Sequence, residues 1–412
     1  MRGGAGDNIF SMDKGETNRA YQAICGLEIR TMKMREIPQL ERMYFEVFGR
    51  WLYRPLRFAE DKTQIYNPRN ARHVWVAVDC GRVVASVSGR PAWVNVDGAL
   101  LRWAAYGSVM TAPAYRGLGL GTRLNELAWN ALRRDGTDGV YISGGRNLYR
   151  RMGSIKAGCF RYYLPRGRDF RGFRAGGGTV QIKPGRLSDT GILVEMCRRQ
   201  RVGYRREPAD FRAPLKYGLA NIYPGKLWMI CRHGRPVAYG LVSWYPGGNG
   251  RILSEGELAD YGGDRTALFL AIPEMARRTG LARLGVTVNG RDDEMNSLFR
   301  SVRVGAEWKR HSGTQVILDA VRTVRRLAPY FRRHLGWEAA QRLRFRRIRA
   351  GGYEFTLGKV RFPVGDDSHF ASLLLGDRPD RFPLLLPRRG VLRDILSRVF
   401  PVPFPPAGIN WI

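Results

Sequence analysis

One arginine and three glycines, Arg116, Gly117, Gly119 and Gly121, lie close together between an apolar run and a helix pattern. Glycine lets the backbone turn tightly and approach a ligand with no Cβ atom in the way. The freed N–H groups and the start of the next helix then face an anion. Residues 116–122 therefore predict a loop that binds phosphate.

The flanking segments must position this loop. Ala104–Thr111 has the composition of a strand and leads into Pro113. Leu120–Arg133 then places apolar residues on one helical face. The glycine spacing is not that of a dinucleotide-binding fold, and no Gly-Lys-Ser/Thr follows, which argues against a nucleotide triphosphate loop.

Other predicted elements complete one domain. They are a strand at Leu27–Met34, a helix at Arg35–Trp51, a hairpin of Val74–Val78 and Val83–Val87, and a strand at Val140–Ser143. Their order, with the loop after the fourth strand, is that of a mixed α/β (α+β) domain.

The segment Arg-x-x-Gly-x-Gly at 116–121 and the segment Asn147-Leu-Tyr149-Arg-Arg-Met-Gly153 together resemble the GNAT superfamily of N-acetyltransferases. The resemblance implies acetyl-CoA or another acyl-CoA as co-substrate and an amine acceptor, either a small molecule or a peptide. It implies Tyr149 as the general acid. It also implies a cofactor-binding set: Val109, Met110, Thr111, Arg116, Gly117, Leu118, Gly119, Leu120, Gly121, Thr122 and Asn147.

The pattern of the first domain, predicted at 26–165 after a flexible tail at 1–25, repeats after a Gly- and Arg-rich linker at 166–178. We interpret 179–319 as a second, degenerate GNAT-like domain. A loop predicted at Asp260–Arg265 lies where the phosphate loop would be, but it lacks the glycine spacing and carries two aspartates. This second domain should bind no CoA.

Residues 320–412 predict a third, small α+β domain, with helix over Val321–Arg349, strands at Tyr353–Val364 and an extended Pro-rich end that should be docked. This layout of tandem GNAT folds is similar to the Eis-like acetyltransferases, whose third domain resembles a sterol carrier protein. That resemblance implies the terminal carboxylate of Ile412 as the catalytic base.

The net charge of +33 and the sequence pI near 10.8 make tRNA or another polyanion an alternative partner. Two other functions therefore stay open. One is aminoacyl transfer from aminoacyl-tRNA, which tandem GNAT folds also perform, and the other is a non-enzymatic scaffold that binds polyanions. Arg166–Arg174 and Arg342–Arg349 are the candidate clusters.

Scattered cysteines and histidines predict no metal site and a cytoplasmic location, and no apolar run is long enough for a membrane span. Cys80 and Cys159 have no histidine nearby in sequence, so we expect them to be structural rather than nucleophilic. Glu41 and Glu46 lie on the first helix, which borders the acceptor site in this fold. The oligomeric state stays open, with a homo-oligomer as one expectation.

Overall fold

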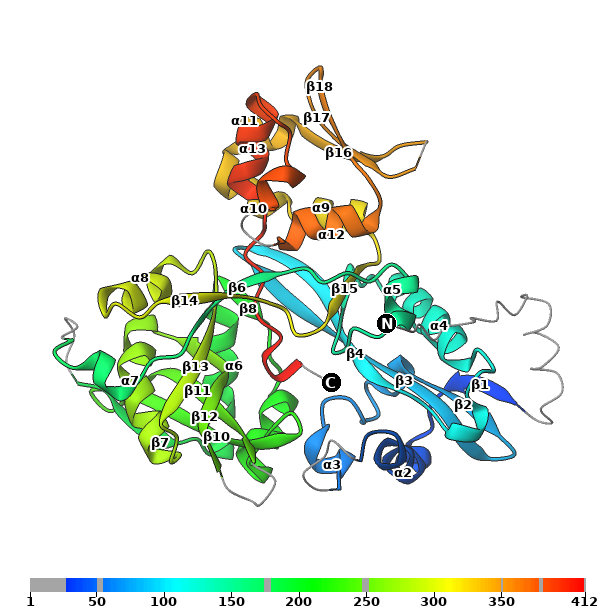
Figure 1. Cartoon of the computed structure of the whole chain (residues 1–412), viewed down its shortest axis with the longest axis horizontal. Coiled ribbons are helices and arrows are strands. Elements are labelled where there is room, and N and C mark those ends of the chain that lie inside the picture. Colours follow the sequence, from blue (N-terminus) through cyan, green and yellow to red (C-terminus); the bar gives the residue numbers. More distant parts are fainter. Residues whose placement is uncertain are drawn as a thin grey trace, which may run out of the picture.

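The computed structural model describes residues 27–49, 55–173, 179–246, 252–349, 351–377 and 381–410. Two large mixed sheets lie side by side, and a third, smaller part sits above them (Figure 1). The predicted tail at 1–25 and the predicted base Ile412 lie outside the described residues.

The first sheet has the strand order β1-β2-β3-β4-β5-β15, with β8 added beside β3. Helix α4 packs on one face and α2 packs on the other, so each face has its own apolar core. The bounds are β1 Glu28–Thr31, α2 Ile37–Phe48, α3 Phe58–Asp61, β2 Val74–Asp79, β3 Arg82–Val96, β4 Ala99–Thr111, α4 Leu120–Arg134, β5 Gly139–Ile142 and α5 Asn147–Arg151.

The second sheet has the order β14-β6-β13-β12-β11-β10-β7. Helix α7 packs across β10, β11 and β12, and a separate core forms beneath it. The bounds are β6 Cys159–Tyr163, β7 Gln181–Pro184, α6 Thr190–Arg199, β8 Val202–Tyr204, β9 Leu219–Ala220, β10 Tyr223–Arg232, β11 Arg235–Pro246, β12 Ile252–Gly263, α7 Arg265–Arg278, β13 Arg283–Asn289, α8 Asp293–Ser301, β14 Ala306–Arg310 and β15 Thr314–Ile317.

The two sheets exchange strands. Strand β6 follows the elements of the first sheet in the chain, yet it pairs between β13 and β14 of the second. Strand β15 follows the elements of the second sheet and pairs antiparallel with β5 of the first. The tandem α/β architecture is confirmed. The domain boundaries 26–165 and 179–319 remain predictions.

Three local predictions need correction. Asp260–Arg265 is not a loop, because β12 continues to Gly263 and α7 begins at Arg265. The helix predicted to reach Arg349 ends at Arg342, where a strand begins. The described part of the predicted linker is a packed turn, since Phe170 and Phe173 contact the ring of Phe269.

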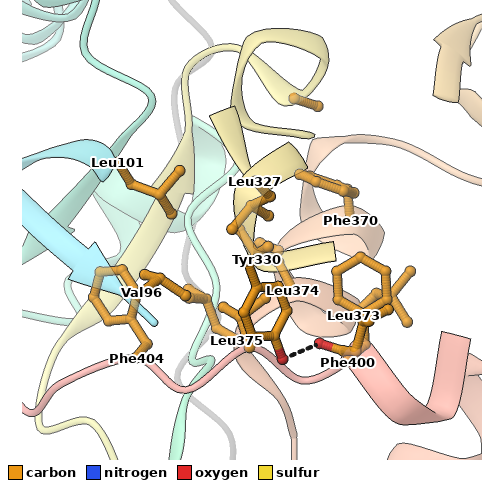
Figure 2. Packing of buried hydrophobic residues seen from close by; sticks show 14 of the residues in the cluster. Val96, Leu101, Leu327, Tyr330, Phe370, Leu373, Leu374, Leu375, Phe400 and Phe404 are labelled. Carbon is orange, nitrogen blue, oxygen red and sulfur yellow. Dashed lines mark hydrogen bonds between the residues drawn. The ribbon is translucent and has the colours of Figure 1, made fainter. Parts of the chain in front are cut away.

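The third part combines helices with a three-stranded sheet of order β16-β17-β18. Its core is continuous with the long β3–β4 hairpin, because Val96 and Leu101 pack with Leu327, Phe370 and the extended chain end at Phe404 (Figure 2). The bounds are α9 Ala320–Arg326, α10 Ala328–Leu335, α11 Trp337–Arg342, β16 Leu343–Arg347, β17 Tyr353–Leu357, β18 Val360–Val364, α12 Asp367–Leu375 and α13 Val391–Val399.

A buried aspartate joins the three parts. Asp97, at the tip of the β3–β4 hairpin, is 3% exposed and has a φ of 47°. Its carboxylate accepts hydrogen bonds from Arg201 of the second part (2.8 and 2.9 Å) and from Arg333 (2.9 Å) of the third, and it lies 2.8 Å from Nε2 of His334. Because Asp97 belongs to the first part and its partners belong to the second and third, this carboxylate fixes how the three parts meet.

We expect Asp97 to make stability depend on pH in acid. Burial raises the pKa of Asp97, but hydrogen bonds from Arg201 and His334 outweigh burial and lower it to about 2. The stabilisation is therefore complete above the usual value near 3.8 and is lost as the pH falls towards 2. Asp97→Asn, which tolerates the positive φ, should cost about 2 kcal/mol at pH 7 and nearly nothing at pH 2. Thermal unfolding of both proteins from pH 2 to 7 checks this, and a gap independent of pH would contradict it.

Candidate active site

The predicted phosphate loop is a glycine-shaped turn at the end of β4. A single 3₁₀ turn, Pro113–Tyr115, leaves the strand and is held by the Tyr115 hydroxyl, which donates to Asp79 at 2.6 Å. Gly117 and Gly119 then have φ values of 84° and 72°, a region that disfavours other residues. Gly119 is the N-cap of α4, so the loop passes directly into the helix.

The backbone donors of this loop are free. In the described part of the chain, the N–H groups of residues 117–122 donate to no protein acceptor. The side chain of Asn125 donates to Gly121 O at 2.6 Å and fixes the first helical turn. Arg116 is exposed and forms no ion pair with a described carboxylate. A helix start with open N–H groups beside a cation is an anion site, so these residues fit a pyrophosphate.

Strand β4 parts from β5 just before the loop. The two strands pair in parallel only from Trp103 to Tyr106, and the last bond is Ser143 N to Tyr106 O at 3.0 Å. Ser108 has a φ of 49°, where the β3–β4 register shifts by a bulge. Beyond this point β4 has a free side, which creates a split between the strands.

The bulge determines which predicted N–H groups face the split. Ala112 N donates to Val84 O of β3 at 2.8 Å, and Met110 lies opposite Ser86 of the same strand. Donors alternate along an antiparallel strand. Thr111 therefore directs its N–H group away from β3 and towards the split, and Met110 directs its own towards β3, while Val109 lies within the bulge itself.

Tyr149 is buried near the end of β5. It belongs to the same apolar cluster as Val109 and Leu120, and a Cβ on Gly144, just after β5, would lie 3.6 Å from its ring. Burial raises the pKa of Tyr149 to about 12, although the charge of Arg146 opposes the rise. The phenol therefore keeps its proton at neutral pH. Asn147 is exposed at the start of α5.

Residues 28–154 match the family model described as an acetyltransferase (GNAT) domain. This part of the chain is a GNAT domain. The fold of the whole chain is also similar to solved structures. They include a GCN5-related N-acetyltransferase from Anabaena variabilis (TM-score 0.62, 12% identity, 92% of this chain and 97% of that one).

Two further solved structures are similar over the same shares, 92% of this chain and 97% of each of theirs. One is a probable N-acyltransferase from Enterococcus faecalis (TM-score 0.61, 14% identity), and the other is Eis1 from Mycobacterium abscessus (TM-score 0.60, 13% identity). At sequence identities this low, the structural similarity establishes a shared fold and nothing more. Among curated proteins, none matches this chain.

The second sheet has a corresponding split between β12 and β13, but a tyrosine bridges it. Strands β12 and β13 also part, after Glu257 and Gly285, but the hydroxyl of Tyr261 donates across the gap to Thr287 O at 3.0 Å. Asp264 accepts a hydrogen bond from Ala267 N at 2.7 Å and so occupies a donor at the start of α7. A carboxylate there also repels phosphate.

We therefore predict that one acetyl-CoA binds per chain, because the Tyr261 hydroxyl bridges the second split and Asp264 places a carboxylate at the start of α7. Calorimetric titration of the wild-type protein gives the stoichiometry. Two equivalents bound with similar affinity would contradict this prediction.

The chain end approaches the GNAT domain in a way that sequence reasoning did not specify. Residues 400–410, here called the C-terminal strap, run between the two sheets (Figure 1). Asn289 donates to Phe404 O at 2.6 Å. Near the end, Asn410 is 1% exposed, and its Oδ1 accepts from Arg90 (3.0 Å) and from Arg206 (2.9 Å). The predicted docking of this segment is confirmed.

The clamp on Asn410 is buried and charged. Arg90 forms an ion pair with Asp210, and Arg206 lies 3.1 Å from Asp260. Arg90 is on β3 opposite Ala105 of β4, near where β4 leaves β5. The strap thus ends beside the strand that carries the bulge. A single asparagine in a Pro-rich tail gives no sequence signal that Asn410 contacts Arg90 and Arg206.

The remaining candidates have contacts of their own. Glu41 accepts a hydrogen bond from Phe58 N at 2.6 Å and so holds α3 in place. Glu46 lines a cavity of about 510 Å³ with Cys80, which lies in the β2–β3 turn. Cys159 begins β6 in the second sheet. Among the described residues, no group of three His, Cys, Asp or Glu side chains could hold a metal ion.

Proposed function

We propose that this chain is an N-acyltransferase that moves an acetyl or other acyl group directly from acyl-CoA to an amine. The observation that carries the proposal is the continuous arrangement of the β4 bulge, the β4–β5 split and the glycine loop. The pairing of β4 with β5 stops at Tyr106, and the N–H groups of residues 117–122 beyond it have no acceptor among the described residues. The GNAT match over residues 28–154 supports the same reaction class.

Each residue then has one task. Acyl-CoA would supply an activated thioester carbonyl when bound. Residues 116–122 hold the pyrophosphate through free N–H groups and the charge of Arg116. Thr111 directs its N–H group into the split, where a carbonyl oxygen gains negative charge during transfer. Asn147 stands beside the loop as a further contact.

Protons move at two atoms. Tyr149 Oη gives its proton to the sulfur that leaves, and a base takes one from the attacking amine. A phenol with a pKa near 12 is a weak acid, so its proton must move as the carbon–sulfur bond breaks. We assign the base to the terminal carboxylate of Ile412, because Asn410 is clamped beside β3 only two residues before it.

The loop is tested at Gly121, the second residue of α4. A Cβ there would lie 3.7 Å from Leu148 Cδ2, an ordinary contact, so Gly121→Val leaves the fold intact while crowding the approach to the helix start. Losing one hydrogen bond to a charged group costs about 1.5–3 kcal/mol, so we expect acetyl-CoA to bind about ten- to a hundredfold more weakly.

Calorimetry on the folded variant measures this affinity. The matched control is Gly191→Val, because Gly191 is the second residue of α6 and has open space around it. It should bind acetyl-CoA as the wild type does. Unchanged affinity in Gly121→Val would refute the loop assignment.

Aminoacyl-tRNA as the donor and a non-enzymatic polyanion scaffold remain alternatives that rest on charge. The cluster predicted at Arg342–Arg349 supports them only by being exposed, because Arg344, Arg346 and Arg347 face solvent on β16. Binding to tRNA would weaken steeply with salt. We place acyl-CoA first since the loop and Tyr149 serve no purpose in a scaffold.

A further inference from the structure

The segment 381–391 of the third part exposes both apolar and basic side chains. Leu384 is 81% exposed, the highest value among the large apolar residues that the structure describes, and Val391 is 53% exposed. Arg381, Arg388 and Arg389 are also exposed. In the described part of the chain, none of these three arginines forms an ion pair, and the segment contains no Asp or Glu. Among the described residues, therefore, no carboxylate is paired with these arginines.

The exposure of Leu384 is selective. The segment begins Arg-Phe-Pro-Leu-Leu-Leu, and Phe382, Leu385 and Leu386 all pack against the core of the third part. Only Leu384 of this apolar run is turned outward. Arg393 donates to Pro387 O at 2.6 Å and so holds the following turn against α13. The outward position of Leu384 thus belongs to a braced turn.

The segment lies in a part of the molecule that can reach a flat surface. The third part lies above the two large sheets, and the β17–β18 hairpin projects from it (Figure 1). Strand β18 contacts α13, and it exposes Val360 at 46% beside Lys359 and Arg361. Residues 320–412 hold eighteen Lys or Arg against seven Asp or Glu.

We propose that the 381–391 segment docks the protein on the surface of a lipid bilayer that contains anionic lipids. Arginine is attracted by the lipid phosphates and carboxylates, while leucine and valine enter the apolar layer just beneath them. RNA offers the same phosphates, but its backbone has no apolar layer to receive Leu384 and Val391. The pairing of the two residue types therefore favours a membrane surface over RNA.

This docking is peripheral. None of the described helices is long and apolar enough to cross a membrane. One short segment with a few arginines gives reversible binding that weakens with salt, because surface potentials are screened within about 10 Å at 0.1 M salt. The proposal is independent of the proposed transferase activity.

Co-sedimentation of the full chain with vesicles tests it, using phosphatidylcholine with 30% phosphatidylserine (about a third anionic, to give a strong surface potential) and pure phosphatidylcholine in parallel. We expect binding to the anionic vesicles only. Arg388→Gln/Arg389→Gln should weaken it by about fivefold per arginine. Leu384→Ser should weaken it about fivefold, and this loss should persist at all salt concentrations.

The controls change equal charge or apolar area elsewhere. Lys183→Gln/Arg186→Gln removes two exposed basic residues outside both candidate polyanion clusters, and Leu187→Ser removes a leucine that is 54% exposed. Both should bind vesicles as the wild type does. The proposal is overturned by absent binding at low salt, by equal losses in the controls, or by variants that lose poly(U) binding but keep vesicle binding. A change in oligomeric mass caused by Leu384→Ser, with vesicle binding kept, would instead assign the segment to a second copy.

Discussion

Tyr149→Phe should lower kcat by about 10²–10⁴-fold, the usual contribution of a positioned general acid. In the described part of the chain, the Tyr149 hydroxyl makes no hydrogen bond, so its removal breaks no contact. The ring stays packed, and the melting temperature and acetyl-CoA affinity should hold. The loss therefore falls on kcat and leaves binding unchanged.

Steady-state kinetics with calorimetry on the same samples measure both quantities. Tyr163→Phe is a suitable control, because Tyr163 is also buried and its hydroxyl, which donates to Asn296 at 2.9 Å, lies in the second sheet. It should cost some stability and no kcat. Native kcat in Tyr149→Phe would end the assignment of the acid.

Extending the chain beyond Ile412 by a few Gly and Ser residues should lower kcat to a similar degree, about 10²–10⁴-fold. The extension displaces the terminal carboxylate and alters no side chain. Asn410 stays held by Arg90 and Arg206, so the strap remains docked and stability should not change. The same residues added before Met1 provide the control.

The two changes combined should cost far less than the product of their separate losses, because acid and base serve one proton path. A fully active extended enzyme would show that the carboxylate is not the base. That result would leave the Tyr149 assignment and the loop assignment intact.

The first domain could be predicted closely from sequence because its signals are local. The hairpin turn at Cys80 and the helix at Leu120–Arg134 follow from turn chemistry and apolar periodicity. The glycines at 117 and 119 adopt the positive φ values that their type permits. These features depend on neighbours in the chain, so a single sequence carries them.

The parts that sequence missed depend on distant contacts. Nothing in the sequence near Asp260 reveals that this residue is buried against Arg206. The sequence therefore predicts a charged loop where the structure has the end of a strand. The alternating pattern of Leu343–Arg347 follows directly on a basic helix, so the sequence alone predicts that the helix continues where the structure has a strand. Likewise, the clamp on Asn410 joins residues more than 200 positions apart.

The exchange of β6 and β15 between the sheets bears on synthesis in the cell. The first sheet cannot be completed until β15, Thr314–Ile317, has left the ribosome, although β5 ends at Ile142. Until then β5 presents an open edge, which is a template for pairing with other chains. A fragment that stops at residue 165 would keep that edge for good and carry β6 with no sheet to join. Nascent chains of this protein should therefore need chaperone protection while the residues between β5 and β15 are translated. The two sheets should also be inherited and lost together rather than shuffled as separate modules.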